Sequence, residues 1–177
     1  MRVVAGKHRG RVLNEFKGKD IRPTADRAKE ALFNILQFDI AGSTFLDLFS
    51  GTGSIGIEAL SRGAGKVVFV DSSLESVKLI KSNLELLKEK AEVYNSDGIT
   101  FLQCLSGKFD YIFIDPPYKS DTGEKALQII SERKLLNVGG AAVYEHDGDY
   151  VKDFDNLEHY DLRRYGIAVF EFYRMKI

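Results

Sequence analysis

The segment FIDPPYK, residues 113–119, ends an apolar run on Asp115 and follows it at once with two of the three prolines of the chain. Successive prolines fix two φ angles and remove two backbone N–H donors. The Asp115 carboxylate and the neighbouring backbone carbonyls then form a rigid corner that only accepts hydrogen bonds. Such a corner fits a donor that carries two N–H bonds, and the exocyclic amino group of a nucleobase is such a donor.

The same corner suggests a reaction. An exocyclic amino nitrogen is a weak nucleophile, because its lone pair is delocalised into the ring. Hydrogen bonds to Asp115 and to the carbonyl of Pro116 would hold both amino hydrogens and direct the lone pair toward an electrophile. Tyr118 would stack on the base, a contact worth on the order of 1–3 kcal/mol. The predicted catalytic set is Asp115, Pro116, Pro117 and Tyr118, and the alternative is a proline-stiffened loop without a function.

A glycine-rich loop, GTGSIG at residues 51–56, lies between a predicted strand and a predicted helix. Glycines in this pattern let the backbone approach a nucleotide closely, and Asp71, which ends the next strand, would bind the ribose. NAD, FAD and S-adenosylmethionine (SAM) all carry such a ribose. Asp47, four residues before Gly51, would repel a pyrophosphate and attract the ammonium group of SAM. The loop therefore favours SAM, although a tight turn without a ligand stays open.

The elements that would position these residues alternate between strand and helix. Predicted strands lie at residues 43–50, 66–71, 91–97, 109–115 and 141–146, with helices within 51–63, 72–90, 98–105 and 123–136. Ser72 and Glu75 are spaced as a capping box, and Gly139 and Gly140 suggest a turn. This order predicts an α/β fold with a parallel sheet, in which the strand ends share one crevice. Residues 157–165 and 167–175 add an antiparallel pair.

The N-terminal end is basic. Residues 1–13 have the pattern of a β-hairpin with its charges near the turn, and residues 21–36 have the spacing of an amphipathic helix. Residues 1–37 carry nine Lys/Arg and four Asp/Glu, a net charge of +5, and the remainder carries −6. A polyanion such as RNA would therefore contact this end, although basic stretches are also common on ordinary surfaces.

Composition describes an ordinary folded protein. The 177 residues carry 44% apolar residues, 29% charged residues and a net charge of −1. Cys104 is the only cysteine, no Cys/His cluster has zinc-ligand spacing, and no stretch resembles a signal peptide or a membrane span. We expect one domain, with a hairpin extension at 1–22 and a core at 23–177. We also expect a cytoplasmic location, no metal, no membrane association and a monomeric state.

Three motifs resemble known families. DLFSGTGS with Asp71 resembles the SAM-binding motif of Rossmann-like class I methyltransferases, in which Asp97 would match an acidic residue near the adenine. DPPY resembles the motif of enzymes that methylate adenine N6 or guanine N2. RPTADRAKEALFN at residues 22–34, GKHRGRVL and the closing YG…FEFY resemble the RsmD family, bacterial enzymes that methylate guanine N2 in 16S ribosomal RNA (rRNA).

The resemblance implies the fold and the roles of the site residues. It implies a Rossmann-like methyltransferase with a seven-stranded, mostly parallel sheet, an antiparallel C-terminal strand and a small N-terminal β-hairpin. The substrate would be one guanine of 16S rRNA in the assembled or assembling small ribosomal subunit. Asp47, Gly51, Gly53, Asp71 and Asp97 would hold SAM, and Arg9, Arg11, Arg22 and Arg27 would contact RNA.

Several alternatives remain at this point. The DPPY motif alone also fits an adenine-N6 methyltransferase that acts on RNA or DNA. The literal G-x-G-x-x-G pattern also fits a nucleotide-dependent oxidoreductase. An RNA-binding assembly factor that has lost the chemistry is an alternative of another class. Arg27 could pair with Glu30 on the helix surface instead of contacting RNA.

Overall fold

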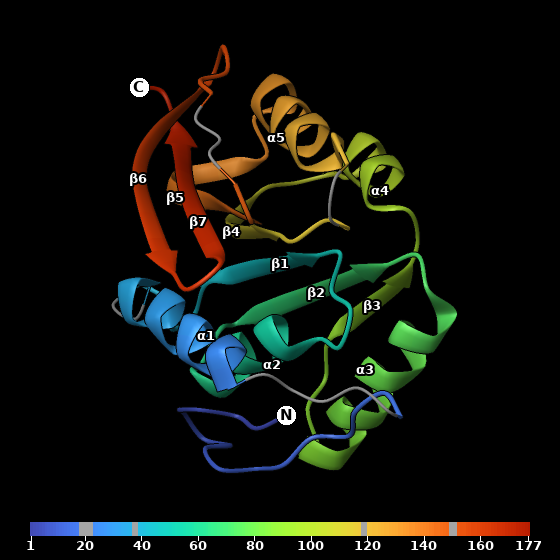
Figure 1. Cartoon of the computed structure of the whole chain (residues 1–177). Coiled ribbons are helices and arrows are strands. Elements are labelled where there is room, and N and C mark those ends of the chain that lie inside the picture. Colours follow the sequence, from blue (N-terminus) through green and yellow to red (C-terminus); the bar gives the residue numbers. More distant parts are fainter. Residues whose placement is uncertain (18–22, 37–38, 118–119, 149–151) are drawn as a thin grey trace.

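A twisted sheet with helices on both faces forms the centre of the molecule (Figure 1). The computed structural model describes residues 1–17, 23–36, 39–117, 120–148 and 152–177. Within these residues the sheet has seven strands in the order β3-β2-β1-β4-β5-β7-β6. The strands are β1 (Thr44–Leu48), β2 (Lys66–Asp71), β3 (Glu92–Asn95), β4 (Phe109–Ile114), β5 (Leu136–His146), β6 (Leu157–Tyr165) and β7 (Ala168–Met175).

The strand directions agree with the expectation from the sequence. Strands β1 to β5 pair in parallel, while β7 is antiparallel to both β5 and β6. Parallel strands need crossover connections, which the helices supply. The helices are α1 (Pro23–Leu36), α2 (Ser54–Ser61), α3 (Leu74–Leu87), α4 (Gly98–Cys104) and α5 (Thr122–Arg133). The predicted Rossmann-like α/β fold is confirmed.

Two hydrophobic cores fill the space between the sheet and its helices. One core joins α1, α2 and α3 to one face of the sheet, and it includes Phe33, Phe45 and Phe69. The other core joins α4 and α5 to the opposite face, and it includes Ile112 and Leu127. Because strand side chains alternate between faces, β1, β2, β4, β5 and β7 contribute to both cores. None of the described helices is long and apolar enough to cross a membrane.

Two local expectations were wrong. Gly139 and Gly140 lie inside β5 rather than in a turn before it. They belong to a bulge opposite Asp110, where a Cβ on Gly140 would come within 2.6 Å of the Asp110 carbonyl oxygen. The N-cap of α3 is Ser73 rather than Ser72, and its side chain accepts a hydrogen bond from the Ser76 N–H.

Candidate active site

A row of carboxyl groups lies at the carboxyl ends of the parallel strands. In β1, β2 and β5, and at the end of β4, a core residue on the α1–α3 side is followed two positions later by an acidic residue. The side chains of a strand alternate, so these acidic residues point to the same side of the sheet. The pairs are Phe45 and Asp47, Phe69 and Asp71, Phe113 and Asp115, and Val143 and Glu145.

The glycine loop is fixed to the end of β2. The backbone N–H of Gly51 donates to Asp71 Oδ2 at 2.8 Å, and the N–H of Ser73 donates to Asp71 Oδ1 at 2.8 Å. Gly51 and Gly53 have φ angles of 53° and 75°, in the left-handed region that glycine adopts without strain. A Cβ on Gly56 would lie 2.3 Å from the Phe69 ring, so glycine lets α2 pack closely on β2.

Asp47 lies beneath this loop. Its side chain is buried, and its Oδ2 accepts a hydrogen bond from the Gly56 N–H at 2.9 Å. Burial raises the pKa of Asp47 well above its usual range. The Gly56 N–H counteracts this shift, while the negative charges of Asp115 and Asp71 add to it. Asp47 therefore holds the start of α2 in place and adds to a region in which a cationic group would be favoured.

Asp97 follows β3 and caps α4. Its Oδ1 accepts a hydrogen bond from the Thr100 N–H at 2.8 Å, and its side chain is exposed. A Cβ on Gly98 would lie 2.5 Å from the Phe49 ring, so this turn and the loop after β1 are in close contact. The structure thus brings Asp97 to the same end of the sheet as the glycine loop.

The Asp115 corner lies at the end of β4. Asp115 is accessible to solvent, yet the surrounding protein removes enough hydration to raise the pKa of its carboxyl group to about 6. Pro116 is buried, whereas Pro117 is exposed and its carbonyl accepts a hydrogen bond from the Ser120 hydroxyl at 2.9 Å. Tyr118, the fourth predicted catalytic residue, lies outside the described residues.

Glu145 is a residue of this site that the sequence reasoning missed. It lies near the end of β5, and Ile114 of β4 pairs with Tyr144, the residue before it. Burial raises the pKa of Glu145 to about 8, and the charge of Asp115 contributes to the shift. The only sequence signal was an acidic residue near the end of a predicted strand.

The basic N-terminal segment, residues 1–17, is called the N-terminal arm below. Its two halves pair as a short hairpin around an antiparallel bridge between Arg2 and Val12, and the Leu13 N–H donates to the Met1 carbonyl at 3.0 Å. Val3 and Leu13 are buried in the main core. Two backbone hydrogen bonds of 2.9 Å, from Val4 and Ala5, end on the fully buried carboxylate of Glu58. The arm is thus packed against α2 as part of the folded core.

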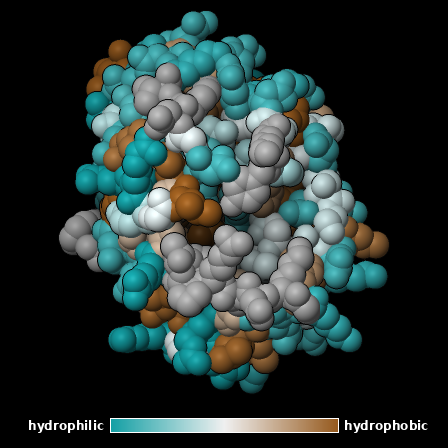
Figure 2. Space-filling view, in the orientation of Figure 1, coloured by the Kyte–Doolittle hydropathy of each residue, from teal (hydrophilic) through white to brown (hydrophobic). Residues whose placement is uncertain are grey.

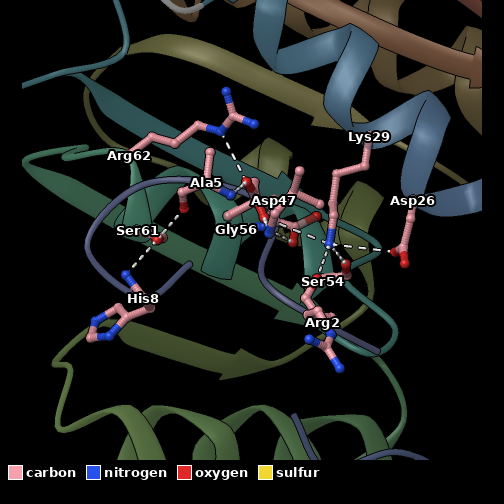
Figure 3. A network of polar contacts seen from close by, with 12 residues as sticks. Arg2, Ala5, His8, Asp26, Lys29, Asp47, Ser54, Gly56, Ser61 and Arg62 are labelled. Carbon is pink, nitrogen blue, oxygen red and sulfur yellow. Dashed lines mark hydrogen bonds and ion pairs between the residues drawn. The ribbon is translucent and has the colours of Figure 1, made fainter. Parts of the chain in front are cut away.

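A buried lysine connects the arm to the glycine loop (Figure 3). Lys29 of α1 donates to the Arg2 carbonyl at 2.9 Å and to the hydroxyl of Ser54, the first residue of α2, at 3.0 Å. Its Nζ lies 3.6 Å from a carboxylate oxygen of Glu58, which also accepts a hydrogen bond from Arg62. Burial lowers the pKa of Lys29, and the nearby Glu58 carboxylate opposes that shift.

The arginines predicted to contact RNA lie on the arm and on α1. Arg9, Arg11 and Arg27 are exposed, and Arg22 lies outside the described residues. Within the described residues Arg27 forms no ion pair with Glu30. The space-filling view shows a mostly hydrophilic surface with small separate hydrophobic groups (Figure 2). The contact of these arginines with RNA stays a prediction.

The fold, the glycine loop and the strand-end carboxylates define the class of Rossmann-like methyltransferases. The family model described as Conserved hypothetical protein 95 matches residues 1–174. Ribosomal RNA small subunit methyltransferase D of Haemophilus influenzae is 39% identical over 154 residues, which cover 84% of this chain and 80% of that protein. The Escherichia coli K12 protein of the same name is 35% identical over 137 residues, 77% of this chain and 69% of that protein.

A solved structure has the same fold over nearly the whole chain. The yhhF protein of Escherichia coli has a TM-score of 0.90 to this chain at 28% identity, with 99% of this chain and 98% of that chain covered. The chain belongs to the RsmD family of methyltransferases, as its sequence motifs indicated.

Proposed function

We propose that this chain transfers a methyl group from SAM to the exocyclic N2 amino group of one guanine in the 16S rRNA of the small ribosomal subunit. The observation that carries the proposal is the position of Asp115, at the end of β4, on the same face as Asp47 and Asp71. The names of the relatives support an rRNA substrate. The DPPY corner supports an exocyclic amino group as the methyl acceptor. The basic N-terminal arm supports RNA as the molecule that carries it.

The charge of the site favours SAM over a dinucleotide. Burial and neighbouring carboxylates both disfavour ionisation of Asp47, and the charge of Asp115 does the same at Glu145. A cationic ligand relieves such repulsion, whereas a pyrophosphate increases it. SAM, when bound, supplies a methyl group activated as a sulfonium. Asp47, Gly51, Gly53, Asp71 and Asp97 are the residues that we assign to its binding.

The chain's own residues orient the amino group. The Asp115 carboxylate accepts one amino N–H and the Pro116 carbonyl accepts the other, which holds the nitrogen in a fixed direction. Tyr118 stacks on the flipped base in this proposal. Pro117 keeps the corner rigid because its ring fixes φ. Its carbonyl also accepts a hydrogen bond from the Ser120 hydroxyl, which holds the next turn of the chain. No metal takes part in this scheme.

The N-terminal arm and α1 bring positive charge to the RNA. Arg9, Arg11, Arg22 and Arg27 are assigned to phosphate contacts, which supply affinity without reading sequence. The assembled or assembling small subunit is the proposed substrate, and its shape selects the guanine. A cytoplasmic location follows from this substrate. We propose that the chain acts as a monomer.

A labelling experiment tests the proposed function. The protein is incubated with labelled SAM and, separately, with small subunits, naked rRNA and DNA, and the modified nucleoside is then identified. We expect label in N2-methylguanosine from the small-subunit sample. Label only in N6-methyladenosine would replace guanine by adenine as the substrate. RNA binding without any methyl transfer, by a chain that binds SAM, would indicate an assembly factor.

A further inference from the structure

Glu145 and Asp115 lie side by side at the ends of adjacent parallel strands. Ile114, the last residue of β4, pairs with Tyr144, and the next residue along the chain is an acid in both cases, Asp115 and Glu145. Tyr144 faces α5, where a Cβ on Gly123 would lie 2.3 Å from its ring. Side chains alternate along a strand, so Glu145 points to the opposite face, which is the face of the candidate active site.

In the part of the chain that the structure describes, no donor reaches the Glu145 carboxyl group. It is half-buried, and no group of the described residues forms a hydrogen bond or ion pair with it. Lost hydration, together with the charge of Asp115, raises its pKa to about 8. A partly buried polar group without a partner costs stability, and such groups are commonly satisfied by a ligand when they line a binding site.

We propose that Glu145 determines the base specificity of the site, by accepting the N1–H of guanine while Asp115 and the Pro116 carbonyl hold the N2 amino group. This inference rests on the proposed function, and it adds the group that distinguishes guanine from adenine. Neighbouring strands are about 4.8 Å apart, so groups at their ends reach adjacent positions on one base edge.

The chemistry of the two purines supports this assignment. In guanine the ring position next to the amino group is N1–H, a donor, and the position beyond it is the acceptor O6. In adenine the position next to the amino group is N1 with a lone pair, an acceptor. An ionised Glu145 accepts from guanine N1–H and repels adenine N1. A protonated Glu145 still accepts N1–H with its carbonyl oxygen and offers its O–H to O6, so guanine satisfies both oxygens.

A base analogue isolates this contact. The target guanine is first mapped, and small subunits are then reconstituted with guanine or 2,6-diaminopurine at that position. 2,6-Diaminopurine keeps the 2-amino group but replaces N1–H by a lone pair and O6 by an amino group. Above pH 8, where Glu145 is ionised, we expect the parent protein to prefer guanine by roughly 10- to 100-fold in kcat/KM, the value of one hydrogen bond to a charged group. Below that pH a protonated Glu145 donates to N1 of the analogue and accepts from its 6-amino group, so the preference should shrink.

Two variants test whether Glu145 causes this preference. In Glu145→Leu the guanine rate should fall toward the diaminopurine rate, so that the ratio of the two approaches one. In Glu145→Gln the amide can accept from guanine N1–H with its oxygen or donate to N1 of the analogue with its N–H. The ratio of the guanine rate to the diaminopurine rate should therefore decrease, while guanine is still methylated. Asp147→Asn, an exposed acid two residues further on, is the matched control and should keep the parent ratio.

The outcomes separate the two proposals. SAM binding by calorimetry and the circular dichroism spectrum establish that each variant is folded. If the parent does not methylate guanine, the proposed function fails. If the parent methylates guanine and analogue equally, or if folded Glu145→Leu and Glu145→Gln both keep the parent ratio, then only the role of Glu145 fails.

Discussion

Replacing Glu58 by alanine should detach the N-terminal arm and destabilise the whole chain. The Glu58 carboxylate is fully buried and accepts hydrogen bonds of 2.9 Å from the Val4 N–H, the Ala5 N–H and the Arg62 side chain. It also lies 3.6 Å from Nζ of the buried Lys29. Its removal leaves the Val4 and Ala5 N–H groups and the Arg62 side chain without this acceptor, and it takes away the carboxylate nearest to Lys29.

The expected loss follows from these contacts. Removing one partner of a buried ion pair costs about 3–5 kcal/mol, because the other charge remains buried. For a domain of this size that corresponds to a fall in Tm of roughly 6–20 °C. Burial already lowers the pKa of Lys29, so loss of its proton limits the cost. Glu58→Gln keeps one acceptor oxygen and should lose about half as much.

Urea denaturation of the purified chain measures this effect. The free energy of unfolding is compared among the parent, Glu58→Ala, Glu58→Gln and the control Glu85→Ala, whose side chain is exposed on α3. The control should change the free energy of unfolding by less than about 0.5 kcal/mol. A loss below about 1 kcal/mol for Glu58→Ala would show that the arm does not depend on this carboxylate.

Four further experiments probe the site. Gly56→Ala should cost about 1–3 kcal/mol of stability in thermal unfolding, because its methyl group would lie 2.3 Å from the Phe69 ring. Asp115→Asn should lower kcat by roughly 100-fold or more while the Kd for SAM measured by calorimetry changes much less; parental turnover would remove Asp115 from the mechanism. Methyl transfer by the parent should fall as the pH decreases through about 6, because Asp115 is then protonated; a flat single-turnover profile across that pH would contradict this role. Arg11→Ala should weaken RNA binding and reduce its salt slope by about 1, and an unchanged slope would place Arg11 outside the interface.

Most of the fold could be predicted from the sequence because its signals are local. Apolar runs of strand length alternate with helical periodicity, and the glycine loop at residues 51–56 marks the first crossover. The bulge in β5 could not be predicted in this way. Gly139 and Gly140 are ordinary turn residues by type, and only the pairing of β5 with β4 places them inside a strand. Long-range pairing overrides local propensity there.

The site was predicted only where a motif carries it. Asp47, Asp71 and Asp115 follow from spacing to glycines and prolines, and the structure brings them to one face. Glu145 has no such motif, because its place beside Asp115 depends on which strands are neighbours and on their register. Glu58 also lacks a signal, since an acidic residue in a short helix is usually exposed.

The position of Lys29 connects the N-terminal arm to the glycine loop. Ser54 follows Gly53 directly and begins α2, so its bond to Lys29 helps fix where that helix starts. Lys29 and Glu58 also hold the backbone of the N-terminal arm, through the Arg2 carbonyl and the Val4 and Ala5 N–H groups. The arm and the glycine loop therefore share the buried pair of Lys29 and Glu58, and a change that displaces the arm removes hydrogen bonds from both of these charged groups.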